Sequence, residues 1–89
     1  MQERYTIRVT ARAERDLQRL PEKMATACGE FIFGPLADHP QRVGKPLRGE
    51  LAGLHAARRG DYRVIYSVVE HARTVQIYHI DRRSDIYRR

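Results

Sequence analysis

Several features that would point to particular protein classes are missing from this 89-residue chain. Its single cysteine, Cys28, makes an intrachain disulfide impossible, which fits a reducing compartment. The N-terminal segment MQERYTIRVT contains no apolar core of a signal peptide. No stretch of the sequence approaches the roughly 20 apolar residues that a membrane span needs. We therefore expect a cytoplasmic protein without a membrane partner.

Signatures of metals and nucleotide cofactors are also missing. The four histidines show no metal-ligand spacing with Cys28 or with the carboxylates. Neither a Walker-type glycine loop nor a GxGxxG motif occurs in the sequence. We therefore expect neither a metal nor a cofactor. Cys28 falls on the apolar stripe of a predicted helix, which favours a core residue over a catalytic thiol.

Negative charge is the scarcer sign, and the formal net charge is +6. Residues 42–63 carry six basic and two acidic side chains, a net +4, and residues 82–89 carry four against one, a net +3. The remaining residues carry seven against eight, a net −1. All of the excess therefore lies in two segments. Such clusters favour a polyanionic partner, most simply nucleic acid, and the arginines that dominate them match phosphate geometry.

The first half of the chain predicts a strand and two helices. Residues 5–9 alternate apolar and polar side chains, which indicates a half-buried strand. Thr10 is a plausible N-cap for a first helix, which Pro21 interrupts. The second apolar stripe predicts another helix that ends between Gly34 and His39. Residues 39–53 are rich in proline, glycine and charge, and we expect a loop there.

The second half predicts three strands, over residues 55–59, 62–69 and 74–80, joined by turns at 60–61 and 70–73. Short turns imply an antiparallel meander, to which the first strand must add. We therefore predict one α+β domain over residues 1–89 in the order β-α-α-β-β-β. An antiparallel sheet would carry the helical hairpin on one face and leave its other face open.

This topology brings the two basic segments together. The start of the 62–69 strand and the end of the 74–80 strand lie at one edge, which places Arg63 near Arg82 or Arg83. Arg58 and Arg59, across the turn, should join them on the uncovered face. The sequence thus predicts a phosphate site there. Tyr62 and Tyr87 flank basic residues, and two roles stay open for them, base stacking and ordinary packing.

Three stretches together resemble the RelE/ParE superfamily of type II toxins, and the RelE branch most closely. They are the helical hairpin, "KPLRGELAGLHAARRGDYRVIY" and the terminal "HIDRRSDIY". The resemblance implies a compact β-α-α-β-β-β fold and an mRNA endoribonuclease that acts in the A site of a translating ribosome. It also implies a cognate antitoxin that wraps and inactivates the toxin, with operator DNA contacted only through the antitoxin complex.

The resemblance also implies site residues. The catalytic candidates are Arg58, Arg63, Arg83 and Tyr87. The substrate-binding candidates are Arg59, Tyr62, Arg82, Lys45 and Arg48. One family feature is missing, because the positions of two second-strand lysines read Ala56 and Arg58. Arginine is a poor proton acceptor, so Tyr87 is the first candidate for the general base.

Two other functions remain open at this point. A ParE-type chain shares the fold but poisons DNA gyrase without catalysis. A plain nucleic-acid-binding module would use the same arginines for grip alone. The set of Arg58, Arg63, Arg83 and Tyr87 favours the nuclease over the ParE type, whereas only a cleavage assay separates the nuclease from the binding module.

Overall fold

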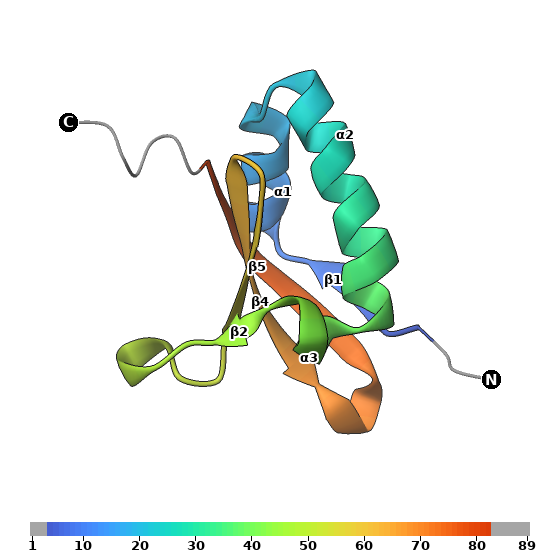
Figure 1. Ribbon diagram of the computed structural model, residues 1–89, viewed down its shortest axis with the longest axis vertical. Helices are drawn as coiled ribbons and strands as arrows, with labels where there is room; N and C mark the ends of the chain where they lie inside the picture. The colour runs from blue at the N-terminus through green and yellow to red at the C-terminus, as the bar shows by residue number, and fades with distance from the viewer. Residues whose placement is uncertain (1–3, 83–89) are drawn as a thin grey trace.

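A five-stranded sheet with helices packed on one face forms the protein (Figure 1). The computed structural model describes residues 4–82. The strands are β1 (Thr6–Val9), β2 (Lys45–Pro46), β3 (His55–Arg59), β4 (Tyr62–Val69) and β5 (Thr74–Arg82), in the spatial order β1-β5-β4-β3-β2. The helices are α1 (Ala11–Arg19), α2 (Glu22–Phe31) and α3 (Pro40–Val43). No helix in this described part is long and apolar enough to cross a membrane.

The helical hairpin forms where the sequence predicts it. Thr10 caps α1, because its hydroxyl oxygen accepts a hydrogen bond of 3.1 Å from the Ala13 amide. Pro21 precedes the first turn of α2, as expected of a residue with a fixed φ and no amide donor. After α2 the chain continues through a π-helical turn, Ile32–Leu36, and leaves the helical conformation before His39. The predicted end between Gly34 and His39 is confirmed.

The predicted meander of three antiparallel strands is also confirmed, but the first strand joins it in the parallel direction. β3 and β4 have the expected bounds and pair antiparallel, as do β4 and β5, and β5 extends to Arg82. β1, however, runs parallel to β5, with Ile7 opposite Val75. The sheet is therefore mixed rather than wholly antiparallel. The alternation of residues 5–9 predicts a strand but carries no information on its direction.

The loop expected over residues 39–53 is the part that the sequence predicts wrongly. It holds α3, the two-residue strand β2 and a 3-10 turn at Gly49–Leu51. Packing against the sheet explains why this segment adopts regular structure. The buried Tyr66 hydroxyl donates a hydrogen bond to the Pro40 carbonyl oxygen. Gly44 lies so close to Tyr66 that a Cβ atom there would overlap the tyrosine hydroxyl. These contacts are tertiary, so local composition does not reveal them.

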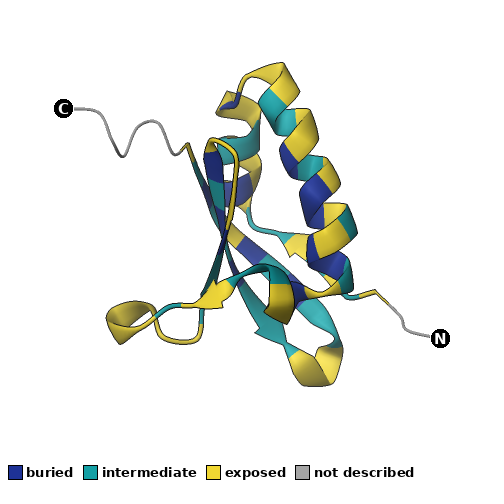
Figure 2. Cartoon of the chain, viewed as in Figure 1, coloured by how far each residue is buried: buried dark blue, intermediate teal, exposed yellow. Residues whose placement is uncertain are grey.

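The two faces of the sheet differ sharply in burial (Figure 2). Tyr62, Val64 and Tyr66 of β4 point toward the helices and are buried, whereas the residues between them are only half-buried. Cys28 of α2 is fully buried in this core, as predicted, and burial raises the pKa of its thiol to about 11. The opposite face carries neither α1 nor α2, and the segment between β2 and β3 projects on that side (Figure 1).

Candidate nucleic-acid interface

Two arginines lie side by side on the open face of the sheet. Arg58 of β3 and Arg63 of β4 are register partners, so their side chains share one face. Ala56 lies on this face too, opposite Lys45 of β2. A cavity of about 460 Å³ is lined by Lys45, Ala56, Arg58 and Arg63, together with Val43, Gly44 and Leu47. The strands thus bring three cationic side chains to one hollow, which we call the basic cavity.

Asp81 of β5 holds Arg63 in place. The two residues are opposite in the register, and Arg63 Nη2 lies 2.8 Å from Asp81 Oδ2. Arg63 Nε is buried and has no hydrogen-bond partner among residues 4–82. A buried donor without an acceptor is costly, and a phosphate oxygen would be a suitable acceptor. Arg63 is therefore oriented by one carboxylate and still has a donor to satisfy.

His79 links this site to the first helix. Its Nδ1 lies 2.8 Å from Asp16 Oδ2 of α1, and its Nε2 contacts Asp81 Oδ1. Both ring nitrogens therefore face carboxylate oxygens, one on α1 and one on β5. Arg12 Nη2 lies 3.3 Å from the same Nε2. Arg63, Asp81, His79 and Asp16 thus form one continuous polar chain from the open face to α1.

The Asp16 carboxylate is well stabilised in its charged form. Partial burial alone would raise its pKa, but hydrogen bonds outweigh this effect. The Ile80 amide donates a 3.0 Å hydrogen bond to Asp16 Oδ2, and the His79 ring adds a second interaction, so the pKa is lowered. Asp16 therefore anchors α1 to β5 and fixes the orientation of His79.

A second hollow adjoins the basic cavity, and its lining is mostly apolar. It has a volume of about 490 Å³ and shares Arg63 as a wall. Its apolar lining consists of Leu51, Leu54, Ile65 and Tyr78, and its polar rim consists of Thr10, Arg12, Arg63, His79 and Asp81. Leu51 and Tyr78 are exposed, at 52% and 37%. We call this hollow the apolar pocket.

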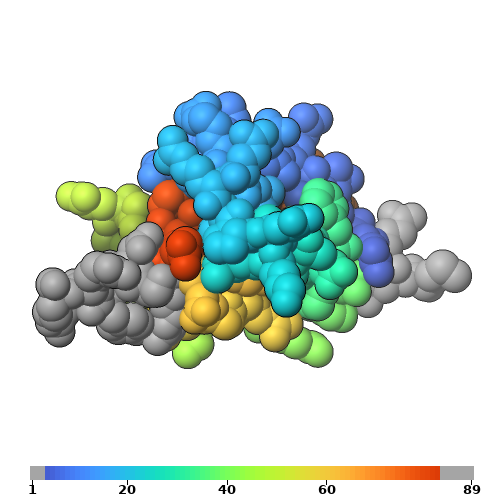
Figure 3. Space-filling model, turned by 90° about the horizontal axis from the view of Figure 1, so that it is seen from above, coloured from blue at the N-terminus to red at the C-terminus, as the bar shows by residue number. Residues whose placement is uncertain are grey.

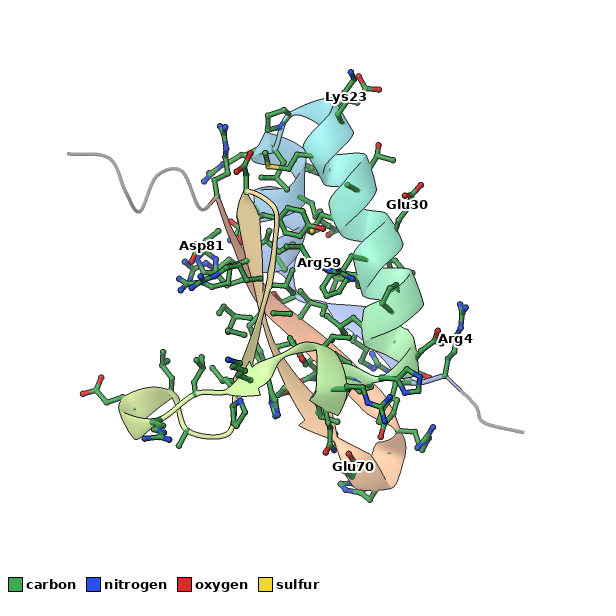
Figure 4. All side chains as sticks on the ribbon, viewed as in Figure 1. Arg4, Lys23, Glu30, Arg59, Glu70 and Asp81 are labelled. Atoms are coloured by element: carbon green, nitrogen blue, oxygen red, sulfur yellow. The ribbon has the colours of Figure 1, made fainter. Side chains whose placement is uncertain are left out.

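Neither Arg59 nor Tyr62 lies on the open face. The expectation that Arg59 would join Arg58 there is wrong, and Tyr62, for which base stacking and packing both stayed open, packs in the core. Arg59 and Tyr62 are register partners on the helix-covered side. The Arg59 guanidinium lies 4.6 Å from the centre of the Phe31 ring of α2, and Figure 4 shows Arg59 between the sheet and that helix, with Asp81 on the other side. Tyr62 is buried, which raises the pKa of its hydroxyl. Strict alternation along each strand separates them from Arg58 and Arg63.

Of the remaining predicted site residues, two are exposed in the described structure and two lie outside it. Arg82 is exposed at the end of β5, and this end of the strand lies beside the β3–β4 turn (Figure 3). Its register partner is Tyr62, so Arg82 falls on the helix-covered side, and the expectation that it would join Arg63 on the open face is wrong. Arg48 is exposed just before the 3-10 turn. Arg83 and Tyr87 lie outside the described residues.

The sequence reasoning missed most of the polar network. It names neither Asp16 nor His79 as a candidate site residue. The spacing of His79 and Asp81, two apart on a strand, places both on one face and was an available signal. The contact with Asp16 depends on how α1 lies against β5, and no local pattern predicts that.

The fold and the basic open face define a class of small toxin. The family model for the ParE toxin of type II toxin–antitoxin systems matches residues 7–87. The chain therefore belongs to the RelE/ParE superfamily of type II toxins.

Similar proteins place the chain in the RelE branch. It is 61% identical to toxin RelE of Mycobacterium tuberculosis over 84 residues, which cover 94% of this chain and 87% of that protein. Toxin RelG of the same organism is 53% identical over 85 residues, covering 96% and 98%. The toxin–antitoxin complex RelBE2 of M. tuberculosis contains a chain with a TM-score of 0.89 and 49% identity, covering 91% of this chain and 100% of that one.

A more distant structure has the same fold. The RelE–RelB complex of Pyrococcus horikoshii includes a chain with a TM-score of 0.72 and 29% identity, covering 91% of this protein and 97% of that chain. The predicted fold class and the predicted family are thus confirmed.

Proposed function

We propose that this toxin is an mRNA endoribonuclease that acts on the ribosome and inhibits translation. The observation that carries the proposal is the placement of Arg58 and Arg63 side by side on the uncovered face, in a cavity shared with Lys45. This geometry suits a phosphate diester, because arginine presents several donors in a planar fork. The relatives named RelE and RelG support the same assignment.

The proposed reaction is a transesterification within the RNA strand. The 2′-oxygen loses its proton and attacks the adjacent phosphorus, and the bond from phosphorus to the 5′-oxygen breaks. The 5′-oxygen leaves with a proton, and a 2′,3′-cyclic phosphate remains. DNA lacks the 2′-hydroxyl and cannot react in this way.

The roles of the side chains follow from this chemistry. Arg58 and Arg63 stabilise the extra negative charge on the crowded phosphorane. Arg83 adds a further cation, and Tyr87, among arginines, is the proposed proton acceptor. Lys45 and Arg48 guide the RNA backbone toward the basic cavity. Arg82 binds the strand near the β3–β4 edge, whereas Arg59 and Tyr62 face the helical layer and have no part in substrate binding.

A cognate antitoxin is the proposed protein partner. Two of the similar structures are complexes of a RelE-type toxin with its antitoxin. The net charge of +6 favours a partner with an acidic surface. Contact with operator DNA would come only through that complex.

In vitro translation with mapped mRNA ends tests the proposal. The wild type should truncate mRNA in the presence of ribosomes, and Arg63→Ala should lower cleavage by about 100-fold or more, as removal of a positioned transition-state donor does. Tyr87→Phe and Arg83→Ala should also lose cleavage. Lys23→Ala, at the far end of α2 (Figure 4), is the matched charge control. Intact mRNA with the wild type would overturn the proposal.

DNA gyrase inhibition is the second candidate. The matching family model describes a ParE toxin, and this observation keeps the candidate open. A supercoiling assay decides between the two: the nuclease predicts undiminished gyrase activity, and gyrase inhibition with intact mRNA would favour the second function. RNA binding without cleavage would favour a simple binding module.

A further inference from the structure

The apolar pocket has a composition that a phosphate site does not need. Leu51, Leu54, Ile65 and Tyr78 form its lining, next to a cavity whose function is proposed to depend on charge. Exposed leucine and tyrosine side chains side by side mark a surface that binds something with an apolar face. A volume of about 490 Å³ is within the range of about 300–1,000 Å³ usual for small-ligand pockets.

We propose that the apolar pocket is a nucleobase subsite that holds one unstacked base of the bound RNA. This inference rests on the proposed function and names the part of the substrate that the pocket takes. Arg63 lines both hollows, so an RNA strand whose phosphate meets the basic cavity has a base beside the apolar pocket. A base has two apolar faces and polar edges, and the pocket offers an apolar lining and a polar rim.

Tyr78 is the side chain best placed to stack on that base. It is the extra residue of a bulge in β5, since Ile65 faces His79 and the next residue, Tyr66, faces Ile77. A bulge re-aims a side chain, and here it leaves the Tyr78 ring exposed on the open face. The Tyr78 hydroxyl donates a 2.6 Å hydrogen bond to Gln76 Oε1, which holds the ring before any ligand binds.

The rim of the pocket can read the edge of a base. Asp81 and Thr10 supply hydrogen-bond acceptors, and Arg12 supplies donors within the same lining. RNA-binding proteins commonly combine an aromatic face with such edge contacts to unstacked bases. A protein helix would instead need an extended apolar stripe, and here four apolar side chains are enclosed by charges of both signs. These observations favour a base over a docked helix.

Binding of a non-cleavable RNA tests the subsite without requiring catalysis. The probe is a short single-stranded RNA with 2′-O-methyl sugars, which cannot undergo the transesterification, titrated against the full chain. Tyr78→Ala should weaken binding by about 5- to 100-fold, the usual effect of losing one stacked base. Leu51→Ala should weaken it by a smaller factor. Tyr78→Phe should keep most of the affinity, because the ring that stacks remains and only the hydrogen bond to Gln76 that holds it is lost.

The controls separate the subsite from general effects. Phe33→Ala removes an apolar side chain that is as exposed as Leu51, at 54%, on the helical layer, and should bind RNA normally. The salt dependence of binding should stay unchanged in Tyr78→Ala, because no phosphate contact is lost. A probe with an abasic sugar at the bound position should bind the wild type and Tyr78→Ala equally.

Two results would overturn the inference. One is equal affinity of the wild type, Tyr78→Ala and Leu51→Ala for the RNA. The other is that these two variants bind the cognate antitoxin more weakly but bind RNA as the wild type does, which would show that the pocket binds a protein. If the wild type binds RNA with a Tyr78 effect but cleaves no mRNA, the subsite stands and the proposed nuclease fails. If it cleaves mRNA with no Tyr78 effect on binding, the nuclease stands and the subsite fails.

Discussion

Asp16 shows how one side chain can serve both the fold and the candidate site. It accepts the Ile80 amide hydrogen bond and pairs with His79, so it joins α1 to the strand that carries Asp81. Asp81 in turn orients Arg63. A change at Asp16 should therefore mainly reduce the stability of the fold, and it should also disturb the side chains of the open face.

We predict that Asp16→Ala lowers the free energy of unfolding by about 1–3 kcal/mol, because the buried Ile80 amide loses its acceptor. Urea unfolding followed by circular dichroism measures this difference. Gln18→Ala, an exposed change in the same helix, should stay within about 0.5 kcal/mol of the wild type. Equal losses in the two variants would contradict the anchoring role.

The lowered pKa of Asp16 also predicts an acid dependence of stability. A carboxyl group whose folded pKa lies below its unfolded value stabilises the fold above the unfolded pKa, about 3.9. This contribution is lost as the pH falls through the folded pKa. The stability difference between the wild type and Asp16→Asn should therefore shrink from about pH 5 to about pH 2. Urea titrations at several pH values would detect it, and a constant difference would exclude the linkage.

At the scale of elements, the part of the chain between α2 and β3 is the most informative. Its proline- and glycine-rich composition predicts a loop, yet α3 contacts Tyr66 of β4 and β2 pairs with β3. Gly44 permits the close approach to Tyr66, whose burial raises the pKa of its hydroxyl to about 12. The absence of a side chain at Gly44 is therefore a packing requirement.

We predict that Gly44→Ala destabilises the protein by about 1–3 kcal/mol, because the added methyl group overlaps the Tyr66 hydroxyl and approaches the Ala56 carbonyl oxygen. Gly29→Ala is the matched control, since a Cβ atom there meets nothing within 4 Å inside α2. It should stabilise by up to about 1 kcal/mol through helix propensity. Thermal unfolding compares them, and a neutral Gly44→Ala would contradict the packing argument.

The elements differ in how far the sequence predicts them. β3, β4 and the Thr10 cap are set by local patterns, namely alternation and side-chain capping, and these predictions are confirmed. The direction of β1, the order within residues 39–53 and the pairing of Asp16 with His79 depend on contacts between distant residues. The predicted position of Arg59 is wrong because consecutive residues of a strand point to opposite faces of the sheet. Arg59 therefore cannot share a face with Arg58.

At the scale of the whole molecule, the two faces of the sheet have different tasks. One face carries the helices and the core, and the other presents Arg58 and Arg63 beside Lys45. The net charge of +6 attracts any polyanion, but under the proposed function the position of the charges decides which of them would touch RNA phosphates. Arginines on the two faces should therefore contribute differently to the salt dependence of RNA binding.

We predict that Arg58→Ala and Arg63→Ala each reduce the slope of log K against log salt by about 0.7, the value for one lost phosphate contact with a single strand. Arg59→Ala should leave the slope nearly unchanged, because its guanidinium packs over the Phe31 ring on the helical side. Titrations of the same RNA at several salt concentrations measure all three variants. Arg58 and Arg59 are adjacent in sequence, carry the same charge and are both exposed. The two variants therefore differ only in the face of the sheet from which the arginine is removed. Equal slope changes for these two would show that RNA contacts both faces and would overturn the division of tasks argued for the sheet.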